Sequence, residues 1–223
     1  MNVRDRLGVP PAWQRRLTWA MEVGLVGMLF IGIDRGNTGI IVNTAVALGV
    51  TQLPAVLRRD YGVPMDTGLT LWLTTAVFLH ALGTVGVPGS RASFYTSVWW
   101  WDHLTHLLSS SIVAAAGYAT ARSFDEHAPG VDLTSRFVFV FILLFVLAFG
   151  VLWEVIEFVV GELAVLLGSD SVLTQYGLED TMLDLVFDAV GALVVAVWGT
   201  AHLTGVVGAL GRFFEERGST EGE

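Results

Sequence analysis

The sequence predicts an all-α, polytopic transmembrane helical bundle with six spans. Of its 223 residues, 53% are hydrophobic and 15% are charged, and the mean hydropathy is +0.63. A soluble domain carries about 25% charged residues, spread over its surface. Here the charges are clustered, and between the clusters lie runs of about 20 mainly apolar residues, enough to cross a hydrocarbon core about 30 Å thick. The connections between these runs are too short to hold a soluble domain.

Hydropathy in windows of about 19 residues places the six spans in order. They cover Leu17–Ile33, Thr38–Leu57, Leu69–Val87, Val98–Ala119, Phe137–Glu157 and Thr181–Leu203. The first span follows four arginines, as in a secretory signal, but its apolar stretch is long and no A-x-A cleavage site follows, so we expect a retained helix. The chain then divides into a basic segment (1–16), a membrane domain (17–203) and an acidic tail (204–223).

The distribution of arginine predicts the orientation. All 12 basic residues are arginine, and 10 of them fall in the amino-terminal segment, the second and fourth loops and the carboxyl-terminal tail. Only Arg35 and Arg91 fall on the opposite side. Cytoplasmic loops carry the excess of positive charge, so both termini are predicted to be cytoplasmic, in a multi-pass protein of a prokaryotic cell membrane. The tryptophans lie near both ends of the spans, as interfacial rings do.

Composition also excludes several functions. The chain has no cysteine, which excludes disulfides, thiolate metal sites, iron–sulfur clusters and a cysteine nucleophile. Its net charge of −9 argues against nucleic-acid binding, which needs a basic face. The partner that the composition does imply is the lipid bilayer.

Ionisable residues inside the last three spans are the strongest functional signal. The fourth span opens W-W-W-D-H-L-T-H, with Asp102 and His106 on one helical face. The fifth ends L-W-E-V-I-E-F, with Glu154 and Glu157 three residues apart. The sixth begins with three aspartates at positions i, i+4 and i+8, which form a stripe along one face of the helix. The members of that stripe are Asp180, Asp184 and Asp188.

The predicted topology brings these residues to one depth near the outer surface, with Glu154 and Glu157 at or just below it. Each carboxylate inside a membrane costs roughly 2.5–3.5 kcal/mol, so a group of them must face a cavity, one another or a cation. We expect a divalent cation, Mg²⁺, Mn²⁺, Ca²⁺ or Zn²⁺, because oxygen-rich sites with an imidazole suit these ions. The alternative is a cluster of carboxyl groups that share protons. His80, in the third span at a similar depth, is a possible additional ligand.

Some of these polar residues have simpler interpretations. Glu157 and Asp180 are near helix ends, where an acidic residue can cap a helix or reach the interface. His80 alone favours a hydrogen bond between helices over metal ligation, and the serines after His106 favour close helix packing. His103 points about 100° away from Asp102 on an ideal helix, so we expect it at the interface.

The order D-x-x-x-H, W-E-x-x-E and D-x-x-x-D-x-x-G in successive late helices resembles the YjdF-like prokaryotic inner-membrane proteins and, more distantly, the VanZ-like proteins. The resemblance covers roughly Val98 to Val195. It implies a membrane protein and marks eight positions without assigning a reaction. These positions are Asp102, His106, Trp153, Glu154, Glu157, Asp184, Asp188 and Gly191.

Three functions follow from such a site. The first is a metal-dependent hydrolase or transferase that acts on a lipid or lipid-linked headgroup at the outer leaflet. In it Asp102, His106, Asp184 and Asp188 are the ligands, and Glu154 or Glu157 is the catalytic general base. The second is a proton- or cation-coupled transporter, which commonly shows internal repeats that are not visible here. The third is a non-catalytic protein with a structural ion or a lipid-headgroup binding site. The sequence leaves the oligomeric state open.

Overall fold

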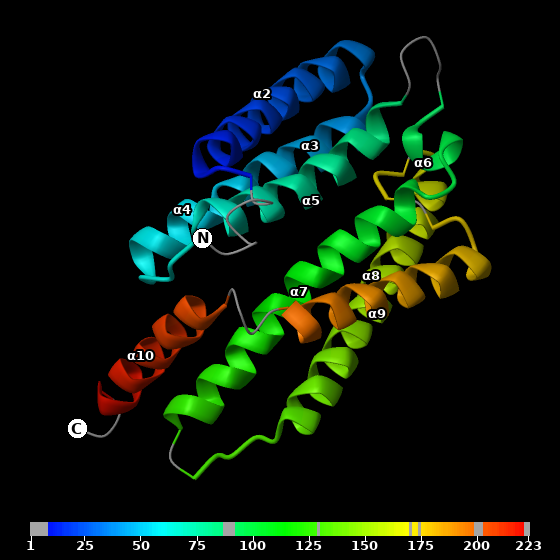
Figure 1. The fold of residues 1–223 in the computed structure, drawn as a ribbon. Helices are drawn as coiled ribbons and strands as arrows, with labels where there is room; N and C mark the ends of the chain where they lie inside the picture. Colours follow the sequence, from blue (N-terminus) through cyan, green and yellow to red (C-terminus); the bar gives the residue numbers. More distant parts are fainter. Residues whose placement is uncertain are drawn as a thin grey trace.

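A computed structural model describes residues 9–86, 92–128, 130–169, 171–173, 175–198 and 203–220. Within these ranges the chain forms helices and no strand, so the all-α class is confirmed (Figure 1). The helices are α2 (Pro11–Arg35), α3 (Thr38–Thr51), α4 (Leu53–Asp60), α5 (Thr67–Val85), α6 (Phe94–Ser97), α7 (Trp101–His127), α8 (Ser135–Leu167), α9 (Leu178–Trp198) and α10 (Thr204–Thr220).

The helices form two groups, each with its own apolar core. In the first, α2, α3 and α5 pack together around Leu25, Met28, Ala47 and Ala81. In the second, α7, α8 and α9 share a larger core that extends to α10. The groups meet through α5 and α7, which lie side by side in the middle of the molecule (Figure 1).

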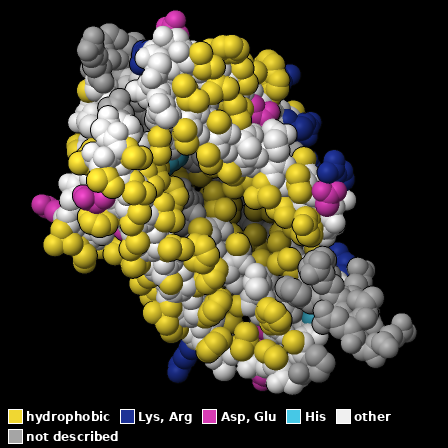
Figure 2. All heavy atoms as spheres, turned by 180° about the vertical axis from the view of Figure 1, so that it is seen from behind, with side chains coloured by type: hydrophobic (Ala, Val, Ile, Leu, Met, Phe, Trp, Pro, Cys, Tyr) yellow, Lys and Arg dark blue, Asp and Glu magenta, His cyan; other side chains and the backbone are white. Residues whose placement is uncertain are grey.

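The surface has the character of a membrane protein. Among the residues described, four helical segments are long and apolar enough to cross a membrane: α2, α3 with α4, α5, and α8. Large apolar side chains point outward, as with Phe30 at 67% exposure and Leu144 at 61%. Figure 2 shows hydrophobic side chains over most of one face, with charged side chains mainly toward its margins. Such a surface is suited to contact with lipid rather than water.

Several helix boundaries differ from the sequence prediction. Helix α2 begins at Pro11 rather than Leu17, and α7 continues past Ala119 to His127. The second predicted span is divided at Gln52 into α3 and α4, because Pro54 has no N–H to continue the helical ladder. The fifth runs ten residues past its predicted end at Glu157, to Leu167, where Gly168 adopts the left-handed conformation that caps it. Its 33 residues span about 50 Å. The prediction was wrong because it treated the two glutamates as a boundary, although apolar residues continue beyond them.

Several sequence predictions fall partly outside the described residues. The predicted end of the third span at Val87 lies there, as do Arg4, Arg6 and Arg91 and part of the sixth span, 199–202. Within the region predicted as an acidic tail, Thr204–Thr220 forms α10.

The connections separate into two ends of the bundle. The α2–α3 turn, α6 and the α8–α9 connection lie toward one end, here called the α6 end, and α4, α10 and the α7–α8 connection lie toward the opposite, α10 end (Figure 1). Two hydrogen bonds join different elements at the α6 end. The Arg35 guanidinium at the end of α2 donates to Val85 O at the end of α5 at 3.0 Å, and Asn43 Nδ2 of α3 donates to Val172 O in the α8–α9 connection at 2.7 Å. Asp102 and His106, at the start of α7, and Asp184 and Asp188, in the first half of α9, lie toward this α6 end.

Candidate metal centre

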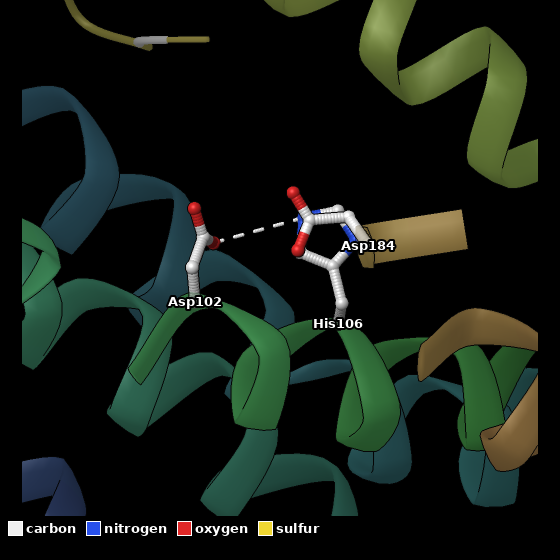
Figure 3. A group of neighbouring side chains, drawn as sticks. All are labelled: Asp102, His106 and Asp184. Atoms are coloured by element: carbon white, nitrogen blue, oxygen red, sulfur yellow. Dashed lines mark ion pairs between the residues drawn. The ribbon is translucent and has the colours of Figure 1, made fainter. Parts of the chain in front are cut away.

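Helices α7 and α9 supply the centre of the site. Asp102 and His106 are one helical turn apart on α7 and project to the same side, and Asp184 of α9 lies beside His106 (Figure 3). His106 Nε2 lies 3.7 Å from Asp102 Oδ1 and 4.0 Å from Asp184 Oδ2. One ligand atom from each of the three residues lies within 4.8 Å of the others, a spacing that can hold a metal ion.

Two further carboxylates surround the same imidazole. Glu154 of α8 places Oε1 at 4.0 Å from His106 Nε2, and Asp188 of α9 places Oδ1 at 3.4 Å from His106 Nδ1. His106 therefore lies among four carboxylates supplied by three helices. The expectation that the motifs of the last three helices converge on one point is confirmed by these distances.

Glycines allow the three helices to approach this closely. A Cβ on Gly191 would overlap Ser110 Oγ and Leu107 O of α7, and a Cβ on Gly150 would overlap the carboxylate of Asp188. Ser110 Oγ instead donates within its own helix, to Leu107 O at 3.1 Å. The interpretation of the α7 serines as small packing residues is confirmed for Ser110.

The carboxylates of the site are buried, and one of their oxygens has no partner. Asp184, Asp188 and Glu154 are only 1%, 4% and 5% exposed. Glu154 Oε2 accepts from Thr181 Oγ1 at 2.7 Å, but Glu154 Oε1 has no hydrogen bond to the described part of the chain. A buried carboxylate oxygen left in this way is costly, and it is directed at His106 and the neighbouring acidic groups. A cation or a proton at this point would satisfy it.

His103 belongs to the site, which corrects the expectation that it is interfacial. It is 7% exposed, its Nδ1 lies 3.0 Å from Asp184 Oδ1, and its ring stacks on Phe187 with centroids 4.9 Å apart. The helical angle between Asp102 and His103 was correct. The expectation failed because α9 crosses between the faces of His103 and His106, so that Asp184 contacts both.

His80 and Asp180 lie outside the group. His80 Nε2 is 3.2 Å from Asn43 Oδ1 and its Nδ1 is 2.9 Å from the Tyr95 hydroxyl, so both ring nitrogens have partners and the helix–helix interpretation is confirmed. Asp180 Oδ2 accepts from the backbone N–H of Tyr176 at 3.2 Å, which is a local contact near the start of α9.

Comparison with known proteins identifies the family. The family described as "Predicted membrane protein (DUF2238)" matches residues 16–205. The chain belongs to the DUF2238 family. A Thermotoga maritima protein, described as an uncharacterized protein, is 35% identical over 133 residues, which are 56% of this chain and 58% of the relative. The match therefore spans less than two thirds of that relative, and no solved structure matches the chain.

Two cavities flank the acidic group of this DUF2238 protein. An apolar cavity of about 450 Å³ lies between α3, α5, α7 and α8 and reaches His106 and Asp188. A polar cavity of about 180 Å³ toward the α6 end reaches Asp102 and Glu157. The face shown in Figure 2 is hollowed near its centre, with hydrophobic side chains around the hollow.

Glu157 lies at the polar cavity, where its Oε1 accepts from Trp153 Nε1 at 3.1 Å. Tyr95 and Tyr176 line the same cavity. Burial, and next the charge of Asp102, raise the pKa of both phenols, so the DUF2238 protein keeps them neutral and able to donate hydrogen bonds.

Proposed function

We propose that this protein is a six-span protein of a prokaryotic cell membrane, with both termini in the cytoplasm and its site open to the outer side. The arginine-bearing helices α4 and α10, the end of α7 that carries Arg122 and the start of α8 that carries Arg136 lie together at the α10 end, as this topology requires (Figure 1). The proposal retains the division into a basic segment (1–16), a membrane domain (17–203) and a tail (204–223). The motifs further support a place among YjdF-like proteins, with VanZ-like proteins as more distant relatives.

The site in this proposal binds one divalent cation, Mg²⁺, Mn²⁺, Ca²⁺ or Zn²⁺. Asp102, His106, Asp184 and Asp188 are the ligands expected from the sequence. The distances favour Asp102, His106 and Asp184 and add Glu154, whereas Asp188 lies beside the other ring nitrogen of His106, where it would orient the imidazole. The observation that carries the proposal is Glu154 Oε1, a buried oxygen without a hydrogen bond that lies 4.0 Å from His106 Nε2. Carboxylate oxygens with an imidazole are a ligand set that these cations accept.

The reaction that best suits this arrangement is metal-dependent hydrolysis or group transfer at a lipid headgroup. A bound cation would polarise the ester or phosphoryl oxygen and acidify a water molecule. Of the two predicted catalytic glutamates, Glu157 is better placed as the general base, because it lies at the polar cavity, where water and a headgroup have access. Glu154 is buried and is better placed as a ligand.

Metal content tests the cation site. Wild-type protein purified in detergent should retain about one divalent cation per chain, and Glu154→Gln should lose it. Glu162→Gln, an exposed position on the same helix, is the matched control and should keep the metal. EDTA should lower the melting temperature of the wild type, because a cation that binds only the folded state stabilises it by mass action. A melting temperature indifferent to EDTA, with Glu154→Gln as stable as the wild type, would favour shared protons instead.

Turnover separates the enzyme from a structural ion site. The structural alternative is favoured by the deep burial of Asp184, which is 1% exposed and joins α9 to α7. Metal-loaded wild type should release headgroups from a prokaryotic lipid extract, and Glu157→Gln should retain its metal but release none. Release by neither protein would leave the structural site as the function, whereas equal release by both would show that Glu157 is not the general base.

A further inference from the structure

The two cavities adjoin, and the acidic group lies between them. Asn43, His80, Val172 and Leu173 line both. His106 and Asp188 contribute to the apolar cavity, and Asp102 and Glu157 contribute to the polar one. A molecule that extended from one cavity into the other would therefore pass beside the proposed cation ligands.

The wall of the larger cavity suits an apolar chain from the bilayer. Its apolar lining includes Val42, Val77, Val113 and Val146, and its volume of about 450 Å³ is within the range of small-molecule sites, about 300–1,000 Å³. Four of its lining residues are also exposed: Val42, Val46, Ser109 and Phe149. These exposed positions place an opening on a surface covered by apolar side chains, through which a lipid chain can enter sideways.

The smaller cavity suits a phosphate that is bound through a cation. The hydroxyl groups of Ser93 and Tyr176 and the amide of Asn37 line this cavity and can donate to phosphoryl oxygens. The hydroxyls of Tyr95 and Ser171 also line it, but they already donate to His80 O and Leu173 O. The cavity also contains Asp102 and Glu157 and, among the residues that the structure describes, no arginine, so these described side chains would repel a free anion. A phosphate becomes compatible with this cavity when a divalent cation neutralises the carboxylates.

We propose that the substrate is an amphiphilic phosphate ester whose apolar chain occupies the cavity between α3, α5, α7 and α8 and whose phosphate lies in the polar cavity beside Asp102. This proposal rests on the proposed cation site and names what that site would act on. In the hydrolytic step, the oxygen of water forms a bond to phosphorus while Glu157 takes a proton from that water. The bond between phosphorus and the ester oxygen breaks, and the ester oxygen leaves with the proton that Glu157 has taken. The products are an alcohol and a phosphate.

Dodecyl phosphate is a suitable probe, measured by calorimetric titration of Mn²⁺-loaded protein in a maltoside detergent. Inorganic phosphate lacks the chain and dodecylamine carries the opposite charge, so they test the two cavities separately. We expect dodecyl phosphate to bind at least tenfold more tightly than either. Tighter binding of dodecylamine would contradict the proposed phosphate site. Equally tight binding of inorganic phosphate would contradict the proposed chain site.

Filling the cavity provides the decisive variant. Ser109 is exposed and lines the apolar cavity, so Ser109→Phe should occupy it without disturbing the core and weaken dodecyl phosphate binding at least tenfold. Ala116→Phe, two turns further along the same face of α7, is the matched control and should bind as the wild type does. Val46→Phe, from the α3 wall, should reproduce the effect of Ser109→Phe.

The Mn²⁺ content of the protein shows whether a negative result contradicts only the chain site or the cation site as well. If Ser109→Phe keeps its Mn²⁺ and still binds dodecyl phosphate normally, the chain site is wrong and the cation site stands. If the wild type binds no Mn²⁺, the proposed function itself fails, and the phosphate proposal fails with it.

Discussion

At the scale of single residues, the site depends on Asp184, whose two oxygens face two imidazoles of one helix. Oδ1 contacts His103 Nδ1 at 3.0 Å and Oδ2 lies 4.0 Å from His106 Nε2. Helical periodicity predicted that Asp102 and His106 share a face, and the structure brings them together. It could not predict the role of His103, because periodicity within one helix does not specify where a neighbouring helix crosses it.

The contact between His103 and Asp184 gives a prediction for stability. His103→Ala would leave Asp184 Oδ1 buried without its partner, which costs about 1–3 kcal/mol, and would also remove the stack on Phe187. The unfolding free energy, measured by denaturant titration in detergent, should fall by that amount. His103→Asn, which retains a donor, should recover part of the loss. No change in His103→Ala would mean that the contact is not stabilising.

At the scale of elements, the site exists because α7 and α9 approach over small residues. The motif that ends in Gly191 was visible in the sequence. The structure explains why its last residue is glycine, because a Cβ added there would overlap α7. The length of α8 was not predictable from the same signals. Glu154 and Glu157 resemble the charged end of a span when read alone, but in the fold they face acidic groups on other helices while apolar residues continue α8 to Leu167.

Two glycine substitutions test whether small residues are needed for α7 and α9 to pack this closely. Gly191→Ala should destabilise the protein by about 1–3 kcal/mol, because overpacking forces the helices apart. It should also weaken metal binding, since α9 carries the ligand Asp184 and Asp188, which contacts His106. Gly161→Ala, in α8 where a Cβ meets nothing within 4 Å, should leave stability unchanged or raise it by about 0.5–1 kcal/mol. Melting both variants with and without EDTA makes the comparison, and equal effects would contradict the packing argument.

At the scale of the whole molecule, composition and hydropathy predicted the helical class and a long helix in each of the six regions. Composition and hydropathy did not predict that the helices pack as two groups. The boundary between these groups, at α5 and α7, depends on which side chains fit together. The chain's lack of cysteine makes its orientation simple to test.

Single cysteines at exposed positions should report the orientation. Ser169→Cys, just after α8 toward the α6 end, should react with an impermeant thiol reagent in intact cells. Ser135→Cys, at the start of α8 toward the α10 end, should react only after the cells are permeabilised. The reverse pattern would place the site on the cytoplasmic side.

The acidic residues that form the site also affect how the chain enters the membrane. In the proposed topology, α7 and α9 must cross the bilayer, although neither is among the segments that are apolar enough by themselves. Asp184 and Asp188 reduce the tendency of an isolated α9 to leave the translocon for lipid. Helix α9 therefore depends on contacts with α7 and α8, already synthesised, to be retained as a span. Membrane integration of the last half is then cooperative: each carboxylate that the site needs makes α9 a poorer span by itself, and the same contacts that bring the carboxylates together offset that loss.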